Sequence, residues 1–393
     1  MNKLCKKTHE YISLKIIKLV RNYLIMPIFM DRHDVPDSMT SETLAKIHQE
    51  DLKIEHKFGC RGFTYWYDDT HKNAICLIEA PNKKAIQDMH FEAHGDVPNS
   101  IIEVEPKIVE SFLGRISDPQ KAVNTELNII NDTAFRVLMV IETSNYLKRI
   151  EGKQFNIFTQ KFHNSVIKTL KHFEGNIVKQ DNTSYLVSFK SVSNAIFCAL
   201  KIQSNIKYIT PKFDTSYRNL KIGLASGVPV TKKDNIFEDA ITLATRMCEI
   251  IKEQIVISPE VKKLYESENR NNFIDNQRIR SLKPEEENFL TQLMDFVETI
   301  WRDSTFRVKD FSKNLGYSKS QLYRKLMNIT GKSPNIFIRD YRLNKALKLL
   351  HDQQGNVSEI AFETGFNSLA YFSKCFKSKF KILPSKYIQQ HLF

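Results

Sequence analysis

Two features of secreted and membrane proteins are missing from this sequence. Its six cysteines are scattered singly, without a C-x-x-C pair, so no disulfide framework is indicated and free thiols in a reducing cytoplasm are expected. The apolar stretch from Ile12 to Met30 is interrupted by Lys15, Lys18 and Arg21. No uninterrupted apolar run in it reaches the length that spans a bilayer. The longer apolar core and the cleavage site of a signal peptide are also not evident. We expect a cytoplasmic protein with no membrane partner.

The length of 393 residues allows two to four domains, and 41% hydrophobic with 26% charged residues is ordinary for globular protein. The formal net charge is +13, and most of it lies in the last quarter. From Arg302 to Phe393 there are 17 Lys and Arg against 6 Asp and Glu, a net +11. Such a basic segment indicates a phosphate-bearing partner. Residues 1–25 are expected to be a poorly ordered or helical extension, with Met26 as an alternative start.

Residues 307–387 contain two similar helical units in tandem. In the first, Val308, Phe311 and Leu315 recur at helical spacing, Gly316 is suited to end that helix, and Ser318 to cap the next. The polar residues expected to face outward on this second helix are Lys319, Ser320, Tyr323 and Arg324. The pattern predicts a helix-turn-helix with a basic second helix.

The second unit repeats the pattern around Gly365, with Phe372 and Phe376 as its apolar residues. Its expected outward residues are Asn367, Ser373, Lys374 and Lys377. Between the units, Ser333 and Pro334 begin a helix. Its apolar residues Leu343, Ala346, Leu347 and Leu350 make it a rigid spacer. A helical bundle with a solvated basic face is the alternative.

This region resembles the AraC/XylS family of bacterial transcription regulators. The resemblance rests on Ile360, Ala361, Gly365, Phe366, Tyr371, Phe372, Ser373, Phe376, Lys377, Pro384, Ser385 and Tyr387. It departs at Lys381, where the family usually has Gly, and at Ile388, where Arg is common. The resemblance implies binding to double-stranded DNA. By family position the base-contacting residues would be Ser320, Tyr323, Arg324, Ala370, Ser373 and Lys374, with Ser368 at the same surface.

The N-terminal part, residues 26–110, reads as strand, helix, two strands, helix and strand. The expected strands are 28–33, 63–67, 74–78 and 101–104, and the helices are 40–56 and 81–93. This order is ferredoxin-like. His90 and His94 are four residues apart and share a helix face, and with His33 and His48 they are candidate ligands for nickel, zinc or copper. An ordinary surface His pair is the alternative.

The segments Met30–His33, His48–Leu52, Cys76–Pro81 and His90–Gly95 resemble a small bacterial family described as nickel-binding, with a ferredoxin-like fold. That resemblance implies a divalent metal, nickel or zinc, bound by matching histidines.

The pattern of residues 134–265 predicts a second α+β sandwich. This segment resembles the class III nucleotide cyclase homology domain. The resemblance rests on segments 175–179, 188–189, 195–203, 222–230, 237–247 and 255–258. Cyclases use two Asp to hold two metal ions. Here Ile141 and Glu142 occupy the first position and Thr183 the second, with Asp181 out of register. Thr242 replaces the nucleotide-positioning Asn, although Arg246 is kept. We therefore predict a non-catalytic domain used for ligand sensing or homodimerisation.

Pro284 and three following Glu mark the expected junction with the DNA-binding domain, residues 285–393. The predicted architecture is thus two α+β, ferredoxin-like sandwich domains followed by an all-α double helix-turn-helix domain. The predicted function is a transcription regulator, not an enzyme, whose N-terminal domains sense a ligand or dimerise. Two alternatives remain: an active nucleotide cyclase with a DNA-binding tail, and a metal-binding store or chaperone.

Overall fold

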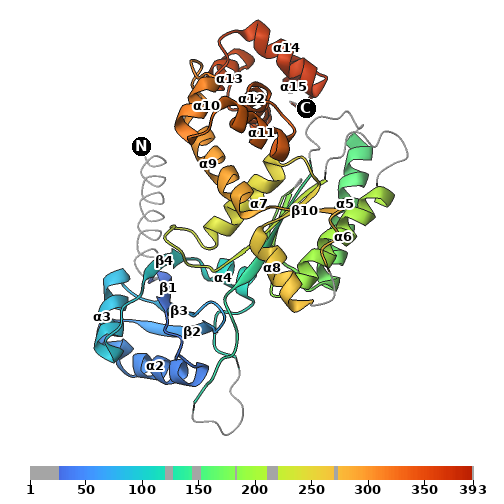
Figure 1. The fold of residues 1–393 in the computed structure, drawn as a ribbon. Coiled ribbons are helices and arrows are strands. Elements are labelled where there is room, and N and C mark those ends of the chain that lie inside the picture. Colours follow the sequence, from blue (N-terminus) through green and yellow to red (C-terminus); the bar gives the residue numbers. More distant parts are fainter. Residues whose placement is uncertain are drawn as a thin grey trace, which may run out of the picture. The chain divides into compact units, whose positions relative to one another are not determined.

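A computed structural model describes residues 26–119, 127–143, 152–181, 184–209, 220–269 and 273–391 (Figure 1). The expected extension at 1–25 and Thr183 lie outside these residues. The chain forms two compact units, one made of residues up to Arg136 with Gly227–Asp239, the other of the remainder. No helix in the described ranges is both long and apolar enough to cross a membrane.

The first unit has the element order expected from the sequence. It comprises β1 (Ile28–Asp34), α2 (Ser41–Ile54), β2 (Arg61–Asp68), β3 (Asn73–Glu79), α3 (Lys83–His94), β4 (Ser100–Val104) and α4 (Pro106–Leu113), with a short 3-10 turn at Glu55–Phe58. The sheet is antiparallel with the order β2-β3-β1-β4. Thr40 and Asn82 cap α2 and α3 by accepting bonds from Thr43 and Ala85 backbone amides. The core lies between the sheet and these two helices.

Two parts of the first unit were not expected. Helix α4 follows β4 directly, and residues 127–136 pack back on the sheet. The Tyr65 hydroxyl donates to the Asn128 carbonyl, and Arg136 donates to the carbonyls of Phe112 and Leu113. These contacts extend the unit beyond residue 110.

The second unit begins with a six-stranded sheet of order β10-β9-β8-β5-β7-β6. Its elements are β5 (Arg136–Thr143), α5 (Gly152–His172), β6 (Asn176–Gln180), β7 (Ser184–Phe189), α6 (Val192–Ile209), β8 (Leu220–Gly227), α7 (Glu238–Ile250), β9 (Ile255–Ile257), α8 (Pro259–Glu268) and β10 (Ile279–Ser281). Its main core includes α5, α6 and one sheet face. Helix α7 comes so close to β8 that a Cβ on Gly223 would lie 2.2 Å from the Ala244 carbonyl oxygen.

Strand β9 is not the edge of this sheet. Strand β10 pairs with β9 in parallel and follows it in the sheet. Pro284 and the acidic residues after it, expected as a junction, instead begin the 17-residue helix α9 (Pro284–Ile300). This helix buries Phe289, Leu293 and Val297 on one face.

Helices continue from α9 to the C-terminus. They are α10 (Val308–Leu315), α11 (Lys319–Thr330), α12 (Pro334–His351), α13 (Val357–Glu363), α14 (Leu369–Phe380) and α15 (Pro384–His391). Ser318 and Gln321 form the expected capping box of α11, and Gly316 ends α10 with φ 70°. Of the predicted apolar face of α10 only Phe311 is fully buried, since Val308 and Leu315 are half-buried. Figure 1 shows α12 running through this helical region.

Candidate functional site

Five polar side chains meet between the sheet and the helices of the first unit. Asp31 and His33 are two residues apart on β1 and so share a sheet face. Asp51 comes from α2, and His90 and His94 come from α3. The exposed fraction is 0% for Asp31 and 1% for His90, and it rises only to 11% for the side chain of His94. Such burial requires that these charges be paired.

His90 lies at the centre of this cluster. Its Nε2 is 2.9 Å from Asp31 Oδ2, and its Nδ1 is 3.1 Å from Asp51 Oδ1. Ionised carboxylates only accept hydrogen bonds, so without a metal His90 donates from both ring nitrogens. Burial alone would lower the pKa of His90, but Asp31 and Asp51 outweigh it and raise this pKa to about 10. Burial would raise the pKa of Asp31, yet its His neighbours hold it well below the usual range.

The cluster contains two overlapping groups of ligand atoms spaced to hold a metal ion. We name Asp31, His33 and His90 the inner set, and Asp51, His90 and His94 the outer set. In each set the ligand atoms lie within 4.8 Å of one another, and the described part of the chain has no third such group. His33 Nε2 is buried and has no hydrogen-bond partner. An imidazole nitrogen left in that state fits a metal ligand, and neutral nitrogen with carboxylate oxygen suits zinc or nickel.

Three of the four histidines selected from the sequence are therefore brought together: His33, His90 and His94. His48 belongs to neither set; its ring lies 4.8 Å from that of Tyr65, and burial lowers its pKa. The two carboxylates, Asp31 and Asp51, were not among the predicted ligands. Their signal in the sequence was an acidic residue at a core-facing position of a strand or helix.

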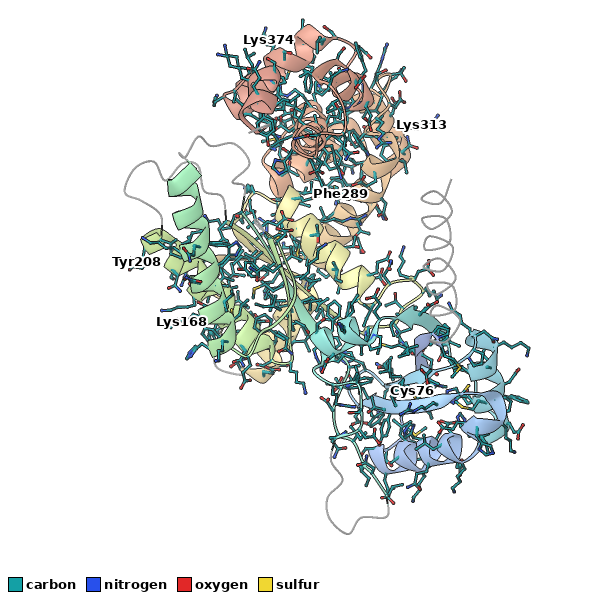
Figure 2. The ribbon with its side chains drawn as sticks, turned by 180° about the vertical axis from the view of Figure 1, so that it is seen from behind. Cys76, Lys168, Tyr208, Phe289, Lys313 and Lys374 are labelled. Carbon is teal, nitrogen blue, oxygen red and sulfur yellow. The ribbon has the colours of Figure 1, made fainter. Side chains whose placement is uncertain are left out.

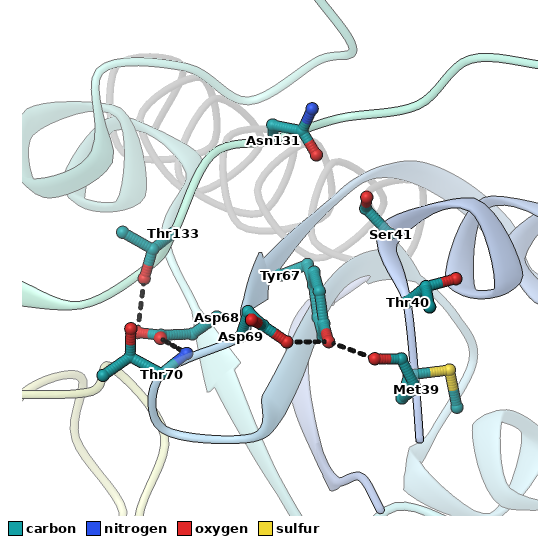
Figure 3. A pocket seen from close by; sticks show the side chains of 9 residues that line it. All are labelled: Met39, Thr40, Ser41, Tyr67, Asp68, Asp69, Thr70, Asn131 and Thr133. Carbon is teal, nitrogen blue, oxygen red and sulfur yellow. Dashed lines mark hydrogen bonds between the residues drawn. The ribbon is translucent and has the colours of Figure 1, made fainter. Parts of the chain in front are cut away.

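A separate depression of about 510 Å³ lies beside Tyr67 and Asp68 (Figure 3). Its carboxylates already have partners within the protein. Thr133 Oγ1 donates to Asp68 at 2.6 Å, and the Tyr67 hydroxyl lies 2.9 Å from Asp69 Oδ1 and 2.7 Å from the Met39 carbonyl oxygen. This depression therefore offers no unpaired carboxylate that would identify a ligand.

The residues predicted to contact DNA lie on the outer surfaces of α11 and α14 and at the start of α14. All of them are exposed except Ser373, which is half-buried: Lys319, Ser320, Tyr323, Arg324, Asn367, Ser368, Ala370, Ser373, Lys374 and Lys377. Lys374 is labelled at the outer edge of the helical region in Figure 2. The opposite faces are buried through Leu322 and Leu326 in α11 and through Phe372 and Phe376 in α14.

Helix α12 joins the two helix-turn-helix units as one packed body. Its residues Leu343, Ala346 and Leu350 share a core with α13, α14 and α15. Phe337, nearer its start, has its ring centroid 6.5 Å from that of Phe311 in α10. Because both units pack on the same helix, the spacing between α11 and α14 is fixed.

Arg246 would lie at a nucleotide site by its resemblance to the cyclase family. In the structure it forms an ion pair with Asp295 of α9. Its Nη2 lies 2.5 Å from Asp295 Oδ1. Asp181 accepts hydrogen bonds from the backbone amide and hydroxyl of Ser184 in the turn between β6 and β7. Burial, with the charges of Glu249 and Asp181, raises the pKa of Glu142 on β5 to about 7.

Two family models match parts of this chain. Residues 311–390 match the helix-turn-helix domain family, and residues 29–104 match a family described as nickel responsive protein SCO4226-like. The first matched range lies within the helical region, and the second lies within the unit that carries the Asp and His cluster.

Curated relatives match over about a quarter of the chain. Histidine kinase P4 of Formosa agariphila is 39% identical over 102 residues, 26% of this chain and 7% of that protein. A probable transcription factor, PqrA of Proteus vulgaris, is 29% identical over 102 residues, 26% of this chain and 84% of that protein. Among solved structures, SCO4226 from Streptomyces coelicolor A3(2) is 34% identical, covering 20% of this chain and 94% of that one, with a TM-score of 0.19.

Proposed function

We propose that the protein is a transcription regulator that binds double-stranded DNA through residues 285–393. The observation that carries this proposal is the pair of exposed, polar and basic helices α11 and α14, held by one buried helix, within a range that matches the helix-turn-helix family. Two recognition helices on one body suit successive major-groove faces about 34 Å apart. In this proposal Arg324 recognises a guanine through its bidentate guanidinium. A DNA partner also favours the cytoplasm as its location.

The proposal includes a divalent metal, nickel or zinc, bound in the domain of residues 26–110. The strand order β2-β3-β1-β4 with α2 and α3 supports a ferredoxin-like assignment for this domain. The unpartnered His33 Nε2, between the carboxylate of Asp31 and the ring of His90, supports a metal. In this proposal the metal signals to the DNA-binding region and does not catalyse a reaction. Metal storage as the only function is disfavoured, because it would leave the DNA-binding surface unused.

For residues 134–265 we propose a cyclase-like domain without activity, used for ligand sensing or homodimerisation. The guanidinium of Arg246 is committed to Asp295, and Asp181 holds a turn, so both lie in structural contacts. Without the matching pair of Asp that cyclases use, two metal ions lack their usual ligands for neutralising a triphosphate.

A genome-wide binding map of the intact protein, made without added metal, with added nickel and with added zinc, tests this function. We expect a limited set of promoter-proximal sites whose occupancy changes with nickel or zinc. Uniform recovery of DNA under all three conditions would contradict a sequence-specific regulator. Sites that are unaffected by nickel or zinc would leave DNA binding intact and contradict the metal signal.

A further inference from the structure

The two ligand sets share His90, which limits how they can be filled. A neutral imidazole has one nitrogen with a free lone pair and one N–H. If Nε2 of His90 binds a metal in the inner set, Nδ1–H can still donate to Asp51 Oδ1 at 3.1 Å. If Nδ1 binds a metal in the outer set, Nε2–H can still donate to Asp31 Oδ2 at 2.9 Å. Each arrangement uses the one lone pair, so the sets exclude each other.

The charge of the cluster also favours a single ion. One divalent ion is balanced by the carboxylates of Asp31 and Asp51, which are both buried. A second divalent ion would add two positive charges to the same buried volume, and such charges are costly unless they are paired. Neither set supplies a further carboxylate.

The choice between the sets follows from which atoms lack partners. In the outer set, Asp51 Oδ1 already lies 3.1 Å from His90 Nδ1 and 3.3 Å from His94 Nε2, so its polar atoms are hydrogen-bonded without an ion. In the inner set, His33 Nε2 is buried and lies 3.8 Å from Asp31 Oδ1, close enough for an ion pair but without a hydrogen-bond partner. Two ligands of a tetrahedral ion, each about 2.1 Å from it, lie roughly 3.4 Å apart. The 3.8 Å distance between His33 Nε2 and Asp31 Oδ1 therefore needs only a small contraction for both atoms to bind one ion.

The surroundings of the inner set supply a carboxylate that orients a metal-binding histidine. A ligating imidazole usually donates its other N–H to a carboxylate, which fixes its tautomer and ring orientation. Asp51 lies in that position for His90, whereas Asp96 Oδ2, on an exposed side chain 3.7 Å from Nδ1 of His33, is beyond hydrogen-bond distance. Asp31 is itself held by the backbone amide of Cys76, which donates to its Oδ1 at 3.2 Å.

We infer that one divalent ion binds the inner set, Asp31, His33 and His90, while Asp51 is a positioning residue that holds His90 in the Nδ1–H tautomer. His94 then contacts Asp51 and is not a metal ligand. This inference rests on the proposed metal function and specifies which atoms would carry it out.

The test uses tag-free, full-length protein titrated with nickel chloride, and separately with zinc chloride, by isothermal calorimetry. X-ray absorption on the loaded protein counts the bound imidazoles. The wild type should bind one ion through two imidazoles. His33→Ala should weaken binding by at least a hundredfold and leave one imidazole in the spectrum, and Asp51→Asn should weaken it about 10–100-fold. His94→Ala should stay within about tenfold of wild type, as should His48→Ala, a buried His outside both sets.

Circular dichroism on each variant reports whether it folds, and His33→Gln replaces the alanine variant if that one does not. Loss of binding in His94→Ala with normal binding in the His33 variants would overturn the inference in favour of the outer set. Two ions per chain in the wild type would overturn the single-ion assignment. In both cases the proposed metal function would stand. Absence of nickel and zinc binding in the wild type would instead refute that function, and this inference with it.

Discussion

Arg342 on α12 donates a hydrogen bond from Nη1 to the carbonyl of Gly365, 2.9 Å away in the turn between α13 and α14. The same guanidinium donates from Nε to the carbonyl of Trp301 and from Nη2 to that of Asp303. One side chain thus links the spacer helix, the chain after α9 and the turn of the second helix-turn-helix unit. Gly365 permits this approach, since a Cβ there would lie 2.7 Å from the Trp301 carbonyl oxygen.

Gly365→Ala should therefore destabilise the second helix-turn-helix unit. The residue has φ 79°, which disfavours a side chain, and the added methyl would also collide with fixed backbone. We expect a loss of about 2–4 kcal/mol in the free energy of local opening of α13 and α14. Hydrogen exchange followed by mass spectrometry on the full-length protein measures it.

Gly316→Ala is the matched control, because Gly316 has φ 70° but open space around its Cβ position. It should cost only about 1 kcal/mol. Equal losses for the two variants would show that the contact with Trp301 has no energetic weight.

Lys381→Gly should stabilise the end of α14. Lys381, at the C-cap of α14, adopts a left-handed conformation with φ 61°. The AraC/XylS family, which this region resembles, usually has Gly at that position. Removing the side chain relieves that strain and should add about 0.5–1 kcal/mol to the local opening free energy of α14. Lys386→Gly, inside α15, should instead cost about 1 kcal/mol. A loss of stability in Lys381→Gly would contradict the strain.

Glu142→Gln should stabilise the protein at alkaline but not at acidic pH. The folded pKa of Glu142, raised by burial and by Glu249 and Asp181, is about 7 against an ordinary 4.5. The folded state therefore binds more protons than the unfolded state between these values, so stability falls as pH rises from about 4.5 to 7. Removing the charge should gain about 1–3 kcal/mol at pH 8 and little at pH 4.

Urea unfolding followed by circular dichroism at both pH values tests this dependence. Glu285→Gln, an exposed substitution at the start of α9, should change stability by less than about 0.5 kcal/mol at either pH. A gain in Glu142→Gln that does not depend on pH would contradict the assignment.

The cyclase-like domain proposed for residues 134–265 should make no cyclic nucleotide. Full-length protein incubated with ATP or GTP and manganese should give no cyclic product above buffer, because two metal ions have no pair of Asp to bind them. Product formation that disappears in Asp181→Ala would make the domain an active cyclase.

Much of the element order could be predicted from periodic patterns, but β10 and the start of α9 could not. Strand β10 has three residues, too few for a periodic signal, and its pairing with β9 depends on distant parts of the chain. Helix α9 opens with Glu285, Glu286 and Glu287, which resemble a linker. Its apolar residues come only after them, at helical spacing.

The cluster of Asp and His side chains in the first unit shows the same limit for side chains. The spacing of His90 and His94 could be read directly, because four residues make one helical turn. The addition of Asp31 and Asp51, and the exclusion of His48, depend on how two helices pack across a sheet. An acidic residue between the core-facing Phe29 and His33 on β1 was nevertheless a readable sign of a buried, paired charge.

Selection of bound sequences from a random double-stranded DNA library tests the central claim most directly. Tag-free, full-length protein at moderate salt should enrich one motif with two half-sites about 10 base pairs apart. Arg324→Ala should cost about 1–3 kcal/mol and relax one position of that motif, and Arg324→Lys, which keeps the charge but not the planar fork, should relax the same position. Enrichment of no motif by the wild type, at any tested salt and with or without nickel, would contradict a sequence-specific DNA-binding regulator.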